Sequence, residues 1–184
     1  MRNAVRKMAM AGAALATLAA CGGPGTAGTS ARPRSFNEPV YDASGQEVAR
    51  LTLTQIKPDS VRVRVDATRV PAGTHGTHLH AVGRCEPPGF TTAGPHMNPT
   101  NRQHGLRNPQ GPHLGDMPNL VVGANGQGTL ETTVAGRLTP GQAPIFDADG
   151  TALVIHARAD DQVTDPSGNS GDRIACAVIA APTM

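Results

Sequence analysis

The sequence predicts an all-β domain, an eight-stranded antiparallel sandwich or barrel that carries two long loops. Runs of alternating apolar and polar residues recur along the chain, which is the pattern of strands with one buried face. No segment shows a convincing helical period. The 22 glycines and 16 prolines favour short strands joined by many turns over long helices.

Residues 1–20 precede the fold and have the pattern of a signal peptide. Three basic residues lie among the first seven, and residues 8–20 form a small apolar run that is too short to span a bilayer. The run ends on Cys21 in a tetrapeptide, LAAC, that resembles a bacterial lipobox, where the cysteine becomes the lipid-carrying N-terminus. An ordinary cleaved signal with an incidental cysteine is the alternative.

Residues 21–35 are small, polar and rich in Pro and Gly, which predicts a lipidated N-terminus followed by a flexible tether. One domain follows over residues 36–184, without a repeat or a second zone of composition. We therefore expect a lipid-anchored protein of the cell envelope, at the periplasmic face or the outer membrane.

The net charge of +2 is largely a property of the signal segment. Without residues 1–20, 13 basic and 14 acidic residues remain, a net charge of −1. No basic patch indicates a nucleic-acid partner, so we expect none.

Cys85 and Cys176 remain once Cys21 is assigned to the lipid. A single remaining pair in an exported protein favours a disulfide. It would close a loop of about 90 residues, for which the chain-entropy model allows up to about 4–5 kcal/mol of stabilisation. Two buried free thiols are the alternative.

Eight strands are expected in order along the domain. Residues 61–66 alternate strictly, with Val inward and charge outward, and Asn125-Gly126 is a hairpin turn signal. The expected strands are residues 36–42, 48–54, 61–66, 77–82, 120–122, 129–134, 151–159 and 173–180. Two stretches, residues 83–116 and 160–172, break the pattern. Long loops on a rigid β-scaffold are where function usually lies.

The histidines gather in one part of the chain. All seven lie at or after His75, and six of them lie between residues 75 and 113. His78 and His80 are two residues apart on an expected strand, so both imidazoles leave the same face. The other candidate ligands are His96, His104, His113 and Asp116 from the long loop and His156 from a later strand.

These residue types indicate two transition-metal ions. Imidazole binds both copper and zinc, and a carboxylate suits zinc better than copper. Seven side chains leave two four-coordinate ions one ligand short, unless one imidazole binds an ion through each nitrogen. The count permits such a bridge without proving it. A surface cluster of unliganded histidines is the alternative.

Five segments, in the family's order, resemble the signature blocks of the copper/zinc superoxide dismutases. They are residues 73–80 (GTHGTHLH), 93–99 (AGPHMNP), 113–118 (HLGDMP), 154–161 (VIHARADD) and 168–176 (GNSGDRIAC). The similarity covers about residues 36–180. It implies a Greek-key β-barrel, superoxide as substrate, and one copper and one zinc ion per subunit.

The resemblance also implies a role for each ligand. Copper would be held by His78, His80, His96 and His156, and zinc by His96, His104, His113 and Asp116. His96 would then be the bridge and, on reduction of copper, a proton carrier.

Further residues match family positions outside the ligand set. Asp160 matches the carboxylate that links one ligand of each metal, here His78 and His104, and so fixes the orientation of both rings. Arg173 matches the arginine beside the copper, which attracts the superoxide anion, so Arg173 and His96 are the expected catalytic residues. Cys85 and Cys176 match the family disulfide, and His75 matches a structural histidine.

Three functions compete. The first is the enzyme, the second is a non-catalytic copper/zinc-binding lipoprotein of the envelope, and the third is a structural sandwich with incidental histidines. Arg173 favours catalysis, because a metal store has no need of an arginine there. The spacing of His113 and Asp116 speaks against the third. The family includes monomers and dimers, which leaves a homodimer open.

Overall fold

A computed structural model describes residues 34–138 and 144–180, all within one compact unit, Arg32–Met184. The expected signal peptide, the lipid-bearing Cys21 and nearly all of the expected tether lie outside the described residues. In the described ranges, no helix has the length and apolar character needed to cross a membrane.

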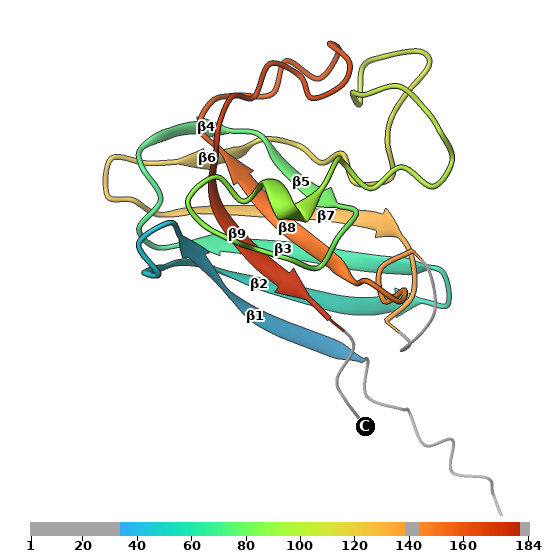
Figure 1. Ribbon diagram of the computed structural model, residues 1–184, viewed down its shortest axis with the longest axis horizontal. Helices are drawn as coiled ribbons and strands as arrows, with labels where there is room; N and C mark the ends of the chain where they lie inside the picture. The colour runs from blue at the N-terminus through green and yellow to red at the C-terminus, as the bar shows by residue number, and fades with distance from the viewer. Residues whose placement is uncertain (1–33, 139–143, 181–184) are drawn as a thin grey trace, which may run out of the picture. The chain divides into compact units, whose positions relative to one another are not determined.

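The described residues form strands and loops, with one turn of 3-10 helix, η1 (Thr91–Ala93) (Figure 1). The strands are β1 (Ser35–Asp42), β2 (Glu47–Lys57), β3 (Ser60–Ala67), β4 (Gly73–His75), β5 (Thr77–His80), β6 (Leu120–Val122), β7 (Gly128–Ala135), β8 (Thr151–His156) and β9 (Arg173–Ile179).

Seven strands form one antiparallel sheet in the order β5-β8-β9-β1-β2-β3-β7, and β4 pairs with β6 in a second, two-stranded sheet. A tight turn joins β6 to β7, where the Gly123 N–H donates to the Gln127 carbonyl at 2.9 Å. Strands far apart in sequence are neighbours, such as β1 and β9. The expected all-β antiparallel fold with two long loops is confirmed.

The strand expected over residues 77–82 is wrong in detail. It corresponds to β5, which ends two residues earlier at His80, and an unpredicted strand, β4, precedes it on the other side of Gly76, which gives nine strands rather than eight in the part of the chain described. The Gly76 N–H donates to the Arg158 carbonyl, and the Gly76 carbonyl accepts from the His156 N–H, both at 2.8 Å. A side chain at position 76 would come within 2.7 Å of Ser170 Cβ, so the chain passes too closely for anything but glycine.

The strand expected over residues 151–159 is also shorter than predicted. β8 ends at His156, and beyond it the Ala157 N–H donates to the Asp172 carbonyl at 2.7 Å. The apolar residues that suggested a longer strand therefore belong to a turn, and the segment from 157 to 172 leaves the sheet.

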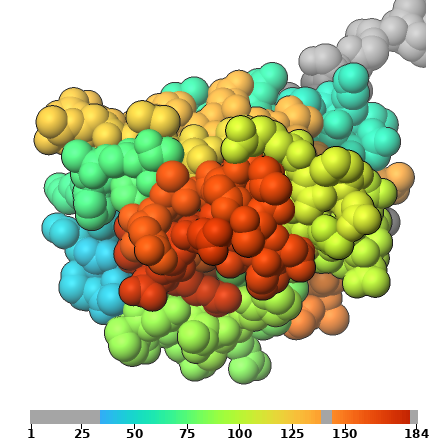
Figure 2. Space-filling model, turned by 90° about the horizontal axis from the view of Figure 1, so that it is seen from above, coloured from blue at the N-terminus to red at the C-terminus, as the bar shows by residue number. Residues whose placement is uncertain are grey.

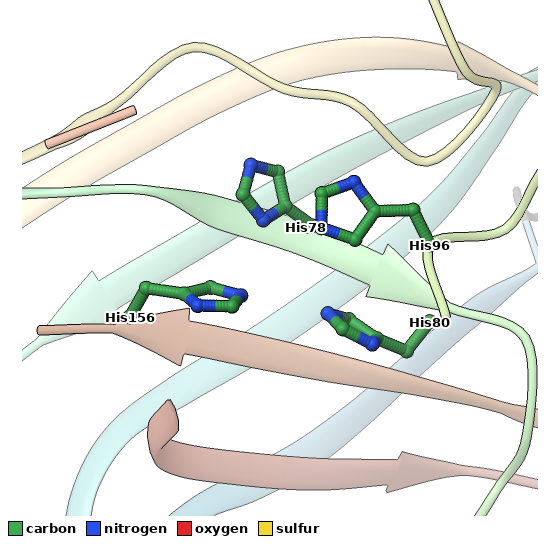
Figure 3. Close-up of side chains that lie close together, drawn as sticks. All are labelled: His78, His80, His96 and His156. Carbon is green, nitrogen blue, oxygen red and sulfur yellow. The ribbon is translucent and has the colours of Figure 1, made fainter. Parts of the chain in front are cut away.

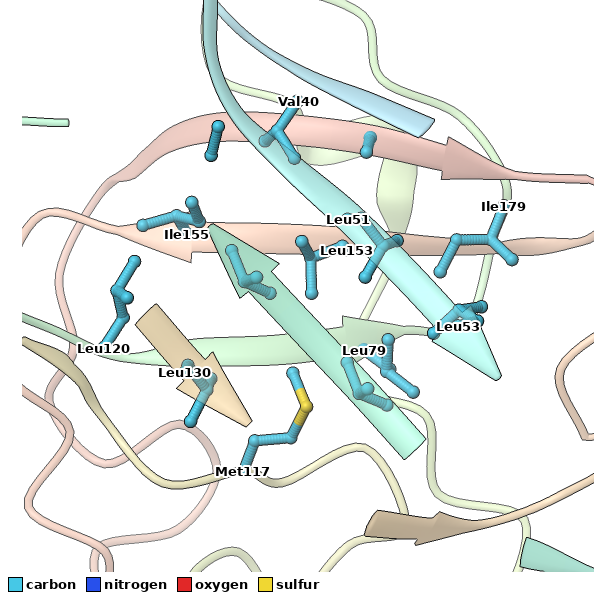
Figure 4. Packing of buried hydrophobic residues seen from close by; sticks show 14 of the residues in the cluster. Val40, Leu51, Leu53, Leu79, Met117, Leu120, Leu130, Leu153, Ile155 and Ile179 are labelled. Carbon is cyan, nitrogen blue, oxygen red and sulfur yellow. The ribbon is translucent and has the colours of Figure 1, made fainter. Parts of the chain in front are cut away.

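The core is mostly aliphatic and follows the alternation of the strands (Figure 4). In β3, Val61, Val63 and Val65 are fully buried, whereas Arg62 and Arg64 between them are exposed. Burial of one such side chain contributes roughly 1.5–3 kcal/mol. The result is a rigid scaffold, and three of the seven metal-ligand candidates project from its strands β5 and β8.

Candidate metal centre

Four histidines meet over the paired strands β5 and β8. His78 and His80 project from β5, His156 ends β8, and His96 comes from the loop that follows β5 (Figure 3). The loop lies against β5, since His80 and His96 form an isolated antiparallel bridge. All four side chains are buried. We call His78, His80, His96 and His156 the four-histidine cluster.

Each imidazole of this cluster has one nitrogen without a hydrogen-bond partner. These atoms are His78 Nδ1, His80 Nε2, His96 Nε2 and His156 Nε2. The ligand atoms of the cluster all lie within 4.8 Å of one another. Because buried polar atoms are nearly always paired, four orphaned nitrogens turned toward one point fit a metal ion that accepts their lone pairs.

In His80 and His156, the hydrogen bond of one ring nitrogen determines which nitrogen stays free. His80 Nδ1 lies 2.8 Å from the Gly94 carbonyl, and His156 Nδ1 lies 3.1 Å from the Gly171 carbonyl. A carbonyl only accepts, so both Nδ1 atoms carry the proton and both Nε2 atoms are left as donors of electron pairs.

A second group joins His96 to three residues of the same loop, His104, His113 and Asp116, and we call these four the mixed cluster. Asp116 Oδ1 lies 3.0 Å from His96 Nδ1, 2.9 Å from His104 Nδ1 and 3.3 Å from His113 Nδ1. A tetrahedral zinc ion with bonds of about 2.0–2.1 Å would separate its ligands by about 3.3 Å. The donor set and its spacing therefore fit zinc.

The backbone holds the carboxylate of the mixed cluster. Asp116 Oδ2 accepts the N–H groups of Gly105 at 2.8 Å and of His113 at 2.9 Å. Its other oxygen, Oδ1, is left for the three ring nitrogens. Asp116 thus offers one oriented oxygen, as a monodentate ligand requires.

Asp160 lies between the two clusters. Its Oδ2 is 2.7 Å from His78 Nε2, and its Oδ1 is 3.0 Å from His104 Nε2. One buried carboxylate thus receives an imidazole N–H from each cluster. This leaves Nδ1 of both rings for a metal.

Burial and charge act differently in the two clusters. Burial lowers the pKa of His80 to about 2 and that of His156 to about 3, with help from nearby positive charge including Arg173. Burial opposes charge on His104 as well, but hydrogen bonds to Asp116 and Asp160 outweigh it and raise the His104 pKa to about 9. The four imidazoles of the first cluster are therefore neutral, whereas the negative charge of Asp116 and Asp160 favours a positive charge, either a proton on His104 or a metal cation, at the mixed cluster.

Arg173 stands beside the four-histidine cluster rather than within it. It opens β9 and pairs in register with His156. Its Nη1 donates to the Phe90 carbonyl and its Nη2 to the Gly94 carbonyl, both at 2.7 Å. The half-buried guanidinium lines a surface hollow together with Thr91 and Gly171.

The Cys85–Cys176 disulfide is confirmed, with Cα atoms 5.7 Å apart. Cys176 lies on β9, and Cys85 lies in the loop after β5 that also contains Phe90 and Gly94. The disulfide therefore attaches this loop, which carries both carbonyl acceptors of Arg173, to β9.

His75 lies outside both clusters. Its Nδ1 is 2.8 Å from the His156 carbonyl and its Nε2 is 2.9 Å from the Pro71 carbonyl. Both nitrogens face backbone oxygens, so the ring ties strands together and has no free nitrogen for a metal.

Several residues that shape the centre escaped sequence reasoning. The Gly94 and Gly171 carbonyls select the free nitrogens of His80 and His156, and Asn119 bonds to the backbone of Asp160. A backbone carbonyl leaves no signature in a side-chain pattern. Of these three residues, only Asn119 acts through its side chain, and its position three residues after Asp116 is the one sequence signal that could have indicated it.

The two long loops cover the metal centre from one side. Figure 2 shows the segment from 157 to 172, in orange-red, at the middle of one face, with yellow-green parts of the loop after β5 beside it. The ligand candidates are thus enclosed between the strands and two loops.

The comparisons with known proteins agree on one family. The family model for copper/zinc superoxide dismutase matches residues 48–179. A protein of Aquifex aeolicus (strain VF5) named superoxide dismutase [Cu-Zn] 1 is 37% identical over 145 residues, which covers 76% of this chain and 84% of that protein. The superoxide dismutase-like protein YojM of Bacillus subtilis (strain 168) is 38% identical over 143 residues, 76% of this chain and 73% of YojM. The crystal structure of a SOD-like protein from Bacillus subtilis superposes with a TM-score of 0.72 at 36% identity, over 78% of this chain and 97% of that one.

Proposed function

Since this chain belongs to the copper/zinc superoxide dismutase family, we propose that it converts superoxide to dioxygen and hydrogen peroxide at a histidine-bridged copper/zinc centre in the cell envelope. We assign copper to the four-histidine cluster and zinc to the mixed cluster, one ion each per subunit. The observation that carries the assignment is the set of four orphaned nitrogens that face one point, next to a carboxylate-containing set that shares His96.

When bound, copper supplies a one-electron redox couple that takes an electron from one superoxide and returns it to a second, while two protons enter the peroxide. The chain must therefore hold a proton near the reacting oxygen. His96 is suited to this role, because its Nδ1 faces Asp116 in the mixed cluster while its unpartnered Nε2 faces the other three histidines of the four-histidine cluster. His96 Nε2 is the atom at which we place the proton between half-reactions.

Arg173 binds and orients the anion in this proposal. Hydrogen bonds to two carbonyls hold the guanidinium in place, and its permanent charge attracts a small anion to the surface hollow that Arg173 lines beside the cluster. Electrostatic steering of the substrate to diffusion-limited rates is known for enzymes of this class.

A metal-reconstitution series tests the enzyme. The purified chain is loaded with copper and zinc, its metal content is measured, and superoxide removal is assayed for wild type, Arg173→Ala, Arg173→Lys and His156→Ala. We expect Arg173→Ala to be roughly ten- to hundredfold slower with both metals retained, and Arg173→Lys to lie between it and wild type. His156→Ala should lose copper and activity together.

A fully loaded wild type that leaves superoxide untouched would support the second candidate, a non-catalytic copper/zinc-binding lipoprotein. The Bacillus subtilis relative keeps this candidate open, because it is named superoxide dismutase-like rather than superoxide dismutase.

We also propose that Cys21 carries a lipid that anchors the protein to a membrane of the envelope. The support is the signal-like segment 1–20, the LAAC tetrapeptide and the Pro/Gly-rich segment 21–35. The disulfide agrees with an oxidising compartment. We expect Cys21→Ser to move the protein from the membrane to the soluble fraction with its dismutase activity intact. Continued sedimentation with membranes would refute the lipid anchor.

A further inference from the structure

Asp160 is the only carboxylate among the described residues that contacts one imidazole from each cluster without itself being assigned to a metal. It lies four residues beyond the end of β8, where the sheet no longer holds the backbone. A ring that donates to Asp160 can point its other nitrogen at a metal only if the carboxylate stays in place. The position of Asp160 therefore needs an anchor outside the ladder of β8.

Asn119 provides such an anchor through two reciprocal hydrogen bonds. Its Nδ2 donates to the Asp160 carbonyl at 2.8 Å, and its Oδ1 accepts the Asp160 N–H at 2.9 Å. One side chain thus satisfies both backbone groups of Asp160, as a neighbouring strand would. Leu120, the next residue, is fully buried and opens β6 opposite His75, so the anchor is itself attached to the sheet.

Gln162 ties the same two segments together a second time. Its backbone N–H donates to Asp160 Oδ1 at 2.6 Å, and its side-chain Nε2 donates to the Met117 carbonyl at 3.2 Å. Residues 117–119 and 160–162 are thus linked by hydrogen bonds in both directions. The first of these segments directly follows Asp116, which belongs to the mixed cluster.

We propose that Asn119 is a positioning residue that fixes Asp160 and thereby orients the imidazoles of His78 and His104 together. This rests on the proposed function, because it concerns the same centre. Asparagine is suited to the position by chemistry: it offers one donor and one acceptor at the tip of a short side chain. Aspartate has no donor, alanine has neither, and glutamine is one methylene longer.

The test observes the two ring protons directly. In the diamagnetic copper(I)/zinc holoprotein labelled with ¹⁵N-histidine, NMR measures solvent exchange of the Nε2–H protons of His78 and His104, which donate to Asp160. His75 is the internal reference, because its ring lies against backbone carbonyls and does not touch Asp160. Wild type is compared with Asn119→Ala and Asn119→Asp.

Asn125→Ala is the matched control. Asn125 also makes two side-chain hydrogen bonds, both to Gln127 in the exposed turn between β6 and β7. Asn119→Ala should speed exchange at His78 and His104 by about tenfold and weaken zinc binding by a similar factor in chelator competition, as partners of metal ligands typically do. Asn119→Asp should fall between Asn119→Ala and wild type, and Asn125→Ala should change neither.

Unchanged exchange at His78 and His104 in Asn119→Ala would overturn the proposal. An equal rise at His75 would also overturn it, since that would mean general loosening rather than loss of position. Neither outcome bears on whether the wild type dismutes superoxide, which the reconstitution assay decides separately.

Discussion

The four-histidine cluster is held by paired strands, whereas the mixed cluster is held by one loop. Three imidazoles of the first come from β5 and β8, and the free nitrogens of His80 and His156 are selected by backbone carbonyls. In the mixed cluster, three ring nitrogens converge on one oxygen of Asp116. The sheet thus shapes the first cluster before any metal arrives, while the second depends on charge and on the course of a loop.

The two clusters also differ in the charge of their imidazoles. Burial keeps the imidazoles of His80, His96 and His156 neutral by lowering their pKa values, to about 4 for His96. Around His104, two carboxylates reverse the effect of burial. Without zinc, a proton on His104 balances part of that negative charge. We infer that the mixed cluster gains more order from its ion than the four-histidine cluster does.

His96→Ala should have the largest effect, because His96 belongs to both clusters. We expect the affinities for copper and for zinc to fall at least about tenfold each, with loss of dismutase activity, since a ligand is removed from both ions at once. Metal content after dialysis against a chelator checks this. Retention of zinc at the wild-type level would show that the clusters do not share this ring.

His113→Ala should separate the two clusters. It removes a ligand only from the mixed cluster, so zinc should be lost while the copper affinity stays within about threefold of wild type. Chelator competition with each ion gives both numbers, and the copper(II) EPR spectrum reports the remaining site. An equal fall in both affinities would contradict the division into a strand-held and a loop-held cluster.

Removal of both metals should give the smallest and most local change. We expect backbone amides in residues 98–119 and 160–170 to exchange with solvent at least about tenfold faster in the metal-free protein, while amides of β2, β3 and β7 keep their rates. Hydrogen exchange with mass spectrometry measures this. Uniform acceleration across the sheet would mean that the scaffold also depends on the ions.

The fold class and the candidate ligands could be predicted from the sequence, because both leave periodic or chemical signatures in it. Alternation marked β3, and the two-residue spacing marked His78 and His80. The short strand β4, which Gly76 separates from β5, was not predicted, because it is defined by pairing with β6 and by the close approach of Ser170 and Asp160 to Gly76 from a distant segment. No local pattern records a contact of that range.

The secondary partners of the centre were missed for the same reason. The Gly171 carbonyl acts through its place in three dimensions, and Asn119 reaches a residue 41 positions away. The roles of His96 and Arg173 came from family resemblance rather than from spacing, and they stay predictions until the variants are assayed.

The pairing of β5 with β8 has a consequence for biosynthesis. His78 lies opposite Val154 in the sheet and contacts Asp160, which is 82 positions later in the chain. Cys85 likewise forms its disulfide with the distant Cys176. During synthesis His78 and His80 therefore emerge long before His156, and the four-histidine cluster cannot close until β8 has been made. We infer that closure of the four-histidine cluster is a late step, because it requires His156 at the end of β8.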